Sequence, residues 1–292
     1  MQKFIGTGVA LVTPFTEDLS VDFEALVKLV NYNIENGTNY LVINGTTAES
    51  ATITSQEKQQ IIDLIITTTN KRVPLVLGVG GNNTATVVDE LKNRDFTGID
   101  GVLSVAPYYS KPTQEGFYQH FKAIAQATDL PIILYNVPGR TAKNMEPSTT
   151  LRLANDFKNV VAIKEAGNNQ QQYYSLIKNK PSDFLIISGD DDLALGVALA
   201  GGSGVISVIG QAFPKQFSAM IQHGLQGNSK QGFAIHYKMM DIVNFIFEEN
   251  NPAGIKEVLQ QLNICTNKVR LPLVEASPEL STKIAKFIEG FN

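Results

Sequence analysis

Several features that would indicate particular functions are rare or missing in this chain of 292 residues. Cys265 is the only cysteine, so the chain cannot form an intramolecular disulfide bond. His120, His223 and His236 are the only histidines, and they have neither the spacing of metal ligands nor a cysteine nearby. The formal net charge is −4 and no basic block occurs, which argues against binding to nucleic acid or anionic membranes. We therefore expect no metal site and no nucleic-acid partner.

Long hydrophobic runs are missing as well. No apolar stretch approaches the length of a membrane span, and the first residues lack the apolar core of a signal peptide. The chain is nevertheless 43% hydrophobic, which is enough for a substantial core at this length. We expect a cytoplasmic protein without a membrane partner.

Glycine-rich nucleotide motifs are incomplete. The segment Gly78-Val79-Gly80-Gly81-Asn82-Asn83 has an asparagine where a dinucleotide-binding fingerprint needs its last glycine, and no P-loop occurs. A doubly wound open sheet, which carries such a fingerprint after an early strand, is therefore the less favoured fold. We expect neither a nucleotide nor another cofactor.

The chain does contain a regular alternation of short apolar segments with longer amphipathic ones. The apolar segments have the composition of buried strands, and they recur at intervals of roughly 20–35 residues, as in repeated βα units. They are 9–12, 40–43, 74–77, 101–105, 132–135, 160–163, 184–187 and 204–208. Eight such units in this length are what an α/β protein with a (β/α)8 TIM barrel needs.

The segments between and after these strands have helical patterns. The apolar residues of 23–34 fall on one helical face, and Thr54 with Glu57 forms a capping box that opens the next helix. Beyond the eighth strand, further helical patterns cover 217–225, 233–247, 255–262 and 278–288. We predict a barrel domain over 1–212 and a C-terminal helical region over 213–292.

Lys164 follows the apolar run 160–163, whose composition is that of a strand buried on both faces. At the C-terminal end of that strand it would lie at the barrel mouth, partly out of water. Such surroundings favour a neutral amine, which can attack a carbonyl group. Taken alone, the segment is better explained by a lysine that reaches the surface past the strand end. The other strand ends reverse that judgement.

Polar side chains follow other strands, and in a barrel these strand ends meet at one face. After the second strand, the N–H groups and hydroxyls of Thr46 and Thr47 could cradle a small carboxylate, although an ordinary polar turn is equally possible. Tyr135 ends the fifth strand, where its phenol could act as general acid and base. Arg140, on the Pro-Gly turn that follows, could hold a carboxylate through two parallel hydrogen bonds, or could simply be solvated.

Three further loops are less distinctive. Tyr108 and Tyr109 follow the fourth strand between prolines, where loop aromatics usually pack or cover an interface, although a phenol can relay a proton. Gly189 and the cluster 201–204 would let the backbone approach a ligand, but the cluster is better explained as a tight turn. An amine, a phenol, hydroxyls and a guanidinium at one mouth together favour Schiff-base chemistry on a keto acid.

At these residues the sequence resembles the pyruvate-dependent class I aldolases, the family typified by dihydrodipicolinate synthase and N-acetylneuraminate lyase. The resemblance covers nearly the whole chain. It is carried by Thr13-Pro14-Phe15, Gly45-Thr46-Thr47-Ala48-Glu49, Pro107-Tyr108-Tyr109, Tyr135-Asn136-Val137-Pro138-Gly139-Arg140-Thr141, Ile163-Lys164-Glu165 and Gly204-Val205-Ile206-Ser207. The Val-Pro-Gly-Arg-Thr segment is similar to the synthase branch, because the neuraminate lyase branch lacks that arginine turn.

The resemblance implies which residues do the chemistry. Lys164 would form an imine with pyruvate, and this imine would acidify the pyruvate methyl group. Tyr135, Thr46 and Tyr109 would relay protons, with Tyr109 reaching into the site of a neighbouring subunit. That role implies a homodimer, which could pair further into a homotetramer.

The resemblance also implies which residues bind the substrates. Thr47 would hold the carboxylate of pyruvate, and Arg140 would hold that of a second substrate, L-aspartate 4-semialdehyde. Gly189 and Ile206 would line the pocket through their backbone carbonyls. The implied reaction is a lyase-type condensation to 4-hydroxy-tetrahydrodipicolinate, for diaminopimelate and lysine synthesis.

Two other functions are open at this stage. A pyruvate aldolase could act on a sugar-acid aldehyde instead, although Arg140 selects aldehydes that carry a carboxylate. A catalytically silent barrel could act as a binding protein, but it would be expected to lack one of Lys164, Tyr135 and the threonines.

The chain departs from the lysine-inhibited members of the family. Their interface pocket uses two imidazoles, at the positions of Ser55 and Lys58 here, and a glutamate, at the position of Thr86. A cationic effector would lose its carboxylate partner and meet an ammonium group instead. We therefore expect no inhibition by free lysine, although Tyr108 and Asn82 would leave room for weak binding.

Overall fold

The structure, a computed structural model, describes residues 2–291 and is built on a closed barrel of parallel strands. The strands are β1 (Gly6–Ala10), β2 (Tyr40–Ile43), β3 (Leu75–Gly78), β4 (Gly101–Val105), β5 (Ile132–Asn136), β6 (Val160–Glu165), β7 (Leu185–Ser188) and β8 (Gly204–Ser207). Each strand pairs with the next one in sequence, and β8 pairs with β1 to close the ring. The predicted (β/α)8 barrel is confirmed.

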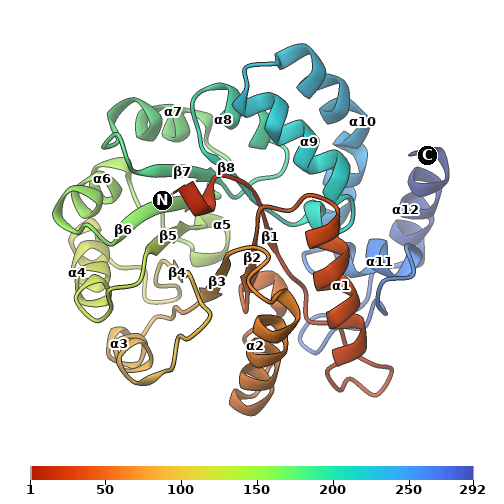
Figure 1. Cartoon of the computed structure of the whole chain (residues 1–292), viewed down its shortest axis with the longest axis horizontal. Helices are drawn as coiled ribbons and strands as arrows, with labels where there is room; N and C mark the ends of the chain where they lie inside the picture. Colours follow the sequence, from red (N-terminus) through yellow and green to blue (C-terminus); the bar gives the residue numbers. More distant parts are fainter. Residues whose placement is uncertain (1, 292) are drawn as a thin grey trace.

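Helices surround the strands, as Figure 1 shows. They are α1 (Phe23–Glu35), α2 (Ser55–Thr69), α3 (Thr84–Asn93), α4 (Gln114–Ala125), α6 (Pro147–Asp156), α7 (Gln170–Asn179), α8 (Ala194–Leu199) and α9 (Pro214–Leu225). Shorter turns are η1 (Gln2–Phe4), η2 (Thr46–Ala48), α5 (Pro138–Thr141) and η3 (Ile209–Gln211). In the described part of the chain, no helix is both long and apolar enough to cross a bilayer.

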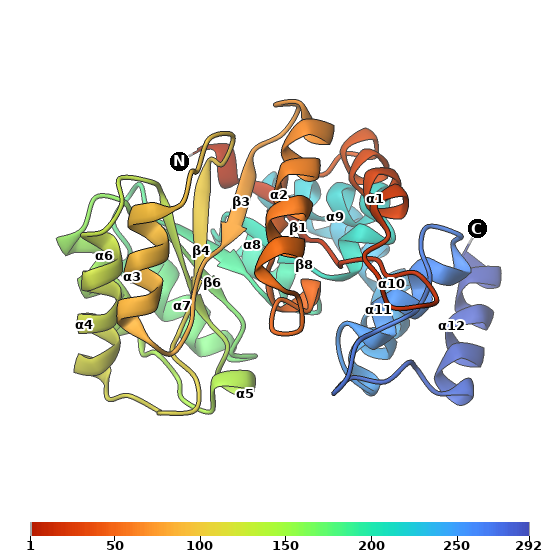
Figure 2. The same ribbon diagram turned by 90° about the horizontal axis from the view of Figure 1, so that it is seen from below.

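Three helices follow the barrel: α10 (Ser229–Glu248), α11 (Ala253–Gln261) and α12 (Pro278–Phe291). They contact one another and lie together at one side of the molecule, away from α3 and α4 (Figure 2). The predicted C-terminal helices are therefore present. The domain boundary at residue 212 stays a prediction, because α9 contacts β1 and β8 as well as α10.

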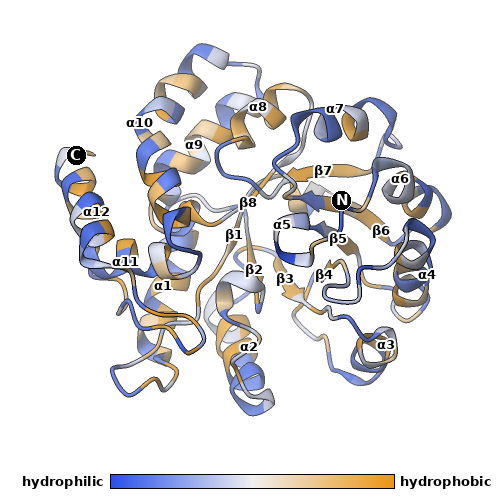
Figure 3. Ribbon diagram, turned by 180° about the vertical axis from the view of Figure 1, so that it is seen from behind, coloured by the Kyte–Doolittle hydropathy of each residue, from blue (hydrophilic) through white to orange (hydrophobic). Residues whose placement is uncertain are grey.

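The strands bury both of their faces. In β2, Tyr40 and Val42 belong to the apolar cluster inside the barrel, whereas Leu41 and Ile43 pack into the larger cluster beneath the helices. The colouring in Figure 3 agrees, with orange along the strands and much blue on the outer helices. Burial on both faces explains why these strands appear in the sequence as unbroken apolar runs.

The first strand differs from its prediction, because it begins at Gly6 and not at residue 9. Its glycine-rich start hides it from a search for apolar runs. Gly8 is required there, since an added Cβ would lie 2.2 Å from the ring of Tyr40. The capping box at the start of α2 is confirmed: Thr54 Oγ1 accepts from Glu57 N, and the Glu57 carboxylate accepts from Thr54 N.

Candidate active site

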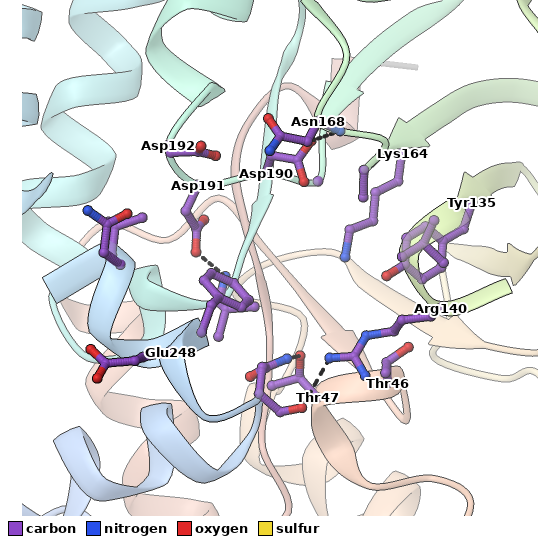
Figure 4. A pocket seen from close by; sticks show the side chains of 18 residues that line it. Thr46, Thr47, Tyr135, Arg140, Lys164, Asn168, Asp190, Asp191, Asp192 and Glu248 are labelled. Atoms are coloured by element: carbon purple, nitrogen blue, oxygen red, sulfur yellow. Dashed lines mark hydrogen bonds between the residues drawn. The ribbon is translucent and has the colours of Figure 1, made fainter. Parts of the chain in front are cut away.

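A cavity of about 380 Å³ opens at the carboxyl ends of the barrel strands (Figure 4). Residues in the last part of β5 and β6, and residues after β2, β5, β6 and β7, form one part of its wall, and the C-terminal helical region forms another. Six predicted site residues line it together: Thr46, Thr47, Tyr135, Arg140, Lys164 and Gly189. The barrel therefore brings into one cavity side chains that are far apart in the sequence.

Lys164 is buried within β6, and its side chain points into the cavity (Figure 4). It pairs in register with Tyr135 of β5, and its Nζ lies 4.5 Å from the centre of the tyrosine ring. Gly189 lies close to the same side chain, because an added Cβ there would be 3.0 Å from Lys164 Cε. A larger residue at position 189 would clash first with Ala166 Cβ and the backbone carbonyl of Glu165, and it would also crowd the lysine side chain.

Thr47 is buried in the turn η2, and its hydroxyl accepts a hydrogen bond from Asn251 Nδ2 at 2.9 Å. The residue after this turn, Glu49, is in the left-handed conformation and is also buried. Its carboxylate forms an ion pair of 2.6 Å with Lys256 and accepts from the backbone N–H of Arg270. The C-terminal region therefore fixes the turn that carries both threonines.

Arg140 lies in α5, a single helical turn that replaces the expected tight Pro-Gly turn. Pro138 begins this helix at a position where its missing N–H is not needed. Nη2 of Arg140 donates to the backbone carbonyl of Asn251 at 3.1 Å and to Asn250 Oδ1 at 3.4 Å. The arginine is exposed, but it is held at the cavity rim and is not free in solvent.

Two predicted site residues do not line this cavity. Tyr109 is 89% exposed and has a positive φ of 68°, so its ring projects away from the described residues. Ile206 is fully buried and belongs to the apolar cluster inside the barrel. The proton relay of Tyr109 and the carbonyl contact of Ile206 stay predictions.

An acidic wall lies opposite Lys164, formed by Asp190, Asp191 and Asp192 of the loop after β7 (Figure 4). Burial raises the pKa of Asp190 to about 6, and burial also raises the pKa of Asp191. Asp191 accepts hydrogen bonds from two backbone N–H groups, those of Val208 and Ile209. The sequence showed these carboxylates after a strand, but only the neighbouring glycine was predicted to matter.

Glu165, next to the lysine, points to the other face of β6. Asn136 Nδ2 donates to both of its carboxylate oxygens at 3.0 Å, and Gln172 Nε2 donates to one of them at 2.8 Å. Burial raises the pKa of Glu165 to about 7. This network ties β5, β6 and α7 together, so it positions the strand end that carries Lys164.

Histidines do not contribute to this cavity. Burial lowers the pKa of His120 to about 4, and its Nδ1 shares a hydrogen bond of 2.8 Å with Thr84 Oγ1. Within residues 2–291, no group of three His, Cys, Asp or Glu side chains is placed to hold a metal ion.

Comparison with known proteins gives consistent results along the whole chain. A sequence model of the dihydrodipicolinate synthetase family matches residues 3–290. The 4-hydroxy-tetrahydrodipicolinate synthase of Flavobacterium psychrophilum is 57% identical over 98% of this chain and 98% of its own, and that of Parabacteroides distasonis is 55% identical over 92% and 91%.

Solved structures give the same result. The dihydrodipicolinate synthase of Aquifex aeolicus has a TM-score of 0.95 and 38% identity, over 99% of this chain and 98% of its own. The enzyme of Acinetobacter baumannii, solved in complex with pyruvate, has a TM-score of 0.95 and 38% identity, over 98% of both chains.

Proposed function

This chain belongs to the dihydrodipicolinate synthetase family, and we propose that the cavity above β6 is the place where its reaction occurs. The enzyme is a lyase that condenses pyruvate with L-aspartate 4-semialdehyde to 4-hydroxy-tetrahydrodipicolinate, in diaminopimelate and lysine biosynthesis. The observation that carries the site assignment is the buried amine of Lys164 in a cavity shared with Tyr135, Thr47 and Arg140.

The covalent steps start at Lys164. Its amine adds to the keto carbon of pyruvate, and loss of water gives an imine. Removal of a proton from the methyl group gives an enamine, whose carbon attacks the aldehyde of the second substrate. The substrate's own amine then adds to the imine carbon, which closes the ring and releases the lysine amine.

Each proton transfer needs a nearby group that can both accept and donate. The ring of Tyr135 lies beside the lysine amine, and Thr46 lines the same cavity. Hydroxyl groups in these positions can pass a proton between the pyruvate carbons and the substrate oxygens. Tyr135 is therefore assigned as the proton donor and acceptor, with Thr46 as its relay.

The two carboxylates have separate binding groups. The hydroxyl and N–H groups of the turn η2, including those of Thr47, suit the small carboxylate of pyruvate. Arg140 at the rim suits the carboxylate of the aldehyde, which arrives after the imine has formed. The arginine thereby selects aldehydes that carry a carboxylate.

Borohydride reduction tests the assignment directly. Enzyme incubated with pyruvate and then reduced should carry a stable adduct on Lys164, located by peptide mass spectrometry. The adduct should be missing when pyruvate is omitted. An adduct on another lysine, or none, would show that Lys164 is a structural residue and would overturn the site assignment.

The assembly is a further part of the proposal. The exposed ring of Tyr109 would complete the proton relay in the cavity of a second copy, so at least a homodimer is needed. Measurement of the molar mass in solution separates a monomer, a dimer and a tetramer. A cytoplasmic location, the place of a biosynthetic enzyme, is proposed on the same basis and can be tested by cell fractionation.

Lack of inhibition by lysine is the regulatory part of the proposal. The ammonium group of Lys58 lines two cavities beside Thr46, one of which Tyr108 also lines. A lysine molecule that enters there meets a like charge, which disfavours its binding. Initial rates should stay unchanged up to millimolar lysine. An inhibition constant in the micromolar to sub-millimolar range would refute this expectation.

A further inference from the structure

We propose that Asn251, just after α10, binds the ammonium group of the second substrate and at the same time positions the two side chains that bind carboxylates. This inference rests on the proposed function, since it concerns how the same cavity recognises L-aspartate 4-semialdehyde. That substrate carries a carboxylate, an aldehyde and an ammonium group. The residues assigned above account for the first two groups only.

Asn251 holds both carboxylate-binding side chains. Its Nδ2 donates to Thr47 Oγ1 at 2.9 Å, and its backbone carbonyl accepts from Arg140 Nη2 at 3.1 Å. The residue is 5% exposed and lines the cavity. One buried residue therefore sets the separation between the site of the pyruvate carboxylate and that of the aldehyde carboxylate.

The remaining polar atom of the side chain has no partner. Oδ1 of Asn251 is buried and makes no hydrogen bond within the described residues. Unpaired buried acceptors are uncommon, because burial removes hydrogen bonds to water without replacing them. A ligand that pairs with this oxygen must be a donor, and the ammonium group is the donor that the second substrate offers.

The chemistry of the substrate places its ammonium group near Asn251. In an α-amino acid, the carboxylate and the ammonium group are attached to the same carbon. When the carboxylate binds Arg140, the ammonium group therefore lies beside the residue whose carbonyl holds that arginine. Oδ1 itself is buried in the structure, so an interaction with it, directly or through one water molecule, requires the side chain to shift toward the cavity.

The charge of the cavity also favours a cation. Its cationic groups are Arg140 and Lys164, whereas its carboxylates are Asp190, Asp191, Asp192 and Glu248. A substrate with only a carboxylate gains nothing from this excess of negative charge, but a zwitterion does. Asp191, across the cavity from Lys164 in Figure 4, also has an unpaired buried oxygen, Oδ1.

Two alcohols that cannot react as aldehydes provide the test. L-homoserine and 4-hydroxybutanoate have the same chain and carboxylate, and only the first carries an ammonium group. Their inhibition constants are measured against enzyme saturated with pyruvate. L-homoserine should bind more tightly by roughly 10- to 100-fold, the effect of one hydrogen bond to a charged group. In the Asn251→Leu variant, the ratio of the two inhibition constants (4-hydroxybutanoate over L-homoserine) should fall to about one.

Control variants separate binding from positioning. Asn244→Leu changes another asparagine of the same cavity wall, and it should leave the ratio unchanged. Asn251→Asp keeps an acceptor and adds a negative charge, so it should raise the ratio even if the leucine variant fails to fold. A ratio that does not rise in Asn251→Asp would overturn the proposal.

Other outcomes are equally decisive. If Asn251→Leu weakens both alcohols by the same factor, the residue only positions its neighbours and the ammonium site is wrong. If both alcohols bind too weakly, the rates at which L-aspartate 4-semialdehyde and 4-oxobutanoate consume the enamine in a single turnover give the comparison, because 4-oxobutanoate has no amine to release Lys164. Failure of the wild-type enzyme to form the pyruvate adduct overturns the proposed function instead, so the two failures are distinguishable.

Discussion

Replacement of Lys164 by arginine should lower kcat by at least about a thousandfold, a loss typical of removing a covalent nucleophile. Arginine keeps the positive charge and much of the length, but its guanidinium stays protonated and cannot form an imine. The substitution therefore separates the nucleophile from the charge. Steady-state rates of condensation, together with the borohydride adduct on pyruvate, measure the effect.

The control for this variant is Lys143→Arg, a lysine that is exposed and does not line the cavity. Its kcat should stay within about twofold of the wild-type value, as expected for a surface substitution. The Lys164→Arg protein should still fold, which circular dichroism can verify. A folded Lys164→Arg enzyme with near-normal kcat would rule out the imine mechanism.

The barrel was predictable from local patterns because each of its strands buries both faces. Runs such as 40–43 and 101–105 contain little except apolar residues, so the strands were located from composition alone. The exception, β1, starts with glycines that pack against Tyr40. Its start depends on a contact with another strand, and no local pattern records such a contact.

The residues of the proposed site were predictable for a similar reason. Lys164 and Tyr135 are each at or near the end of a strand that the sequence had already located. In a barrel the carboxyl ends of all strands meet, so residues at those ends come together without further information. In the structure, six of the proposed site residues, from Thr46 to Gly189, line one cavity.

The residues that hold the turn η2 in place, Asn251 and Lys256, were not predictable in this way. Asn251 contacts Thr47 across 204 positions of the chain, and Lys256 contacts Glu49 across 207. The helical pattern of 255–262 shows which residues are apolar, but it does not show where the helix docks. Asparagine and lysine also occur mostly on surfaces, so neither residue type signalled its burial here.

The C-terminal region therefore has a structural part in the proposed active site, and the pair of Lys256 with Glu49 is its main connection to the turn η2. Lys256 Nζ also donates to the carbonyl of Lys268 and lies 4.0 Å from the ring centre of Phe15. Burial lowers the pKa of Lys256, and the neighbouring Glu49 opposes that shift. The charged, ammonium form of the Lys256 side chain is therefore stabilised by Glu49.

Removal of one member of this pair should be strongly destabilising. Lys256→Met leaves the carboxylate of Glu49 buried without its cation, and we expect a loss of about 3–5 kcal/mol in the free energy of unfolding. The double variant Lys256→Met/Glu49→Gln removes both charges, so it should be more stable than the sum of the two single changes predicts. Urea denaturation at a fixed protein concentration measures all three.

An exposed pair provides the matched control. Lys283 and Glu248 also form an ion pair, at 2.5 Å, but their side chains are 45% and 41% exposed. Lys283→Met should therefore change the free energy of unfolding by less than about 1 kcal/mol. If Lys256→Met were equally mild, the buried pair would not hold the turn η2, and the C-terminal region would have no part in positioning Thr46 and Thr47. A large loss of stability, with a matching fall in kcat at temperatures where the variant is folded, supports the structural role.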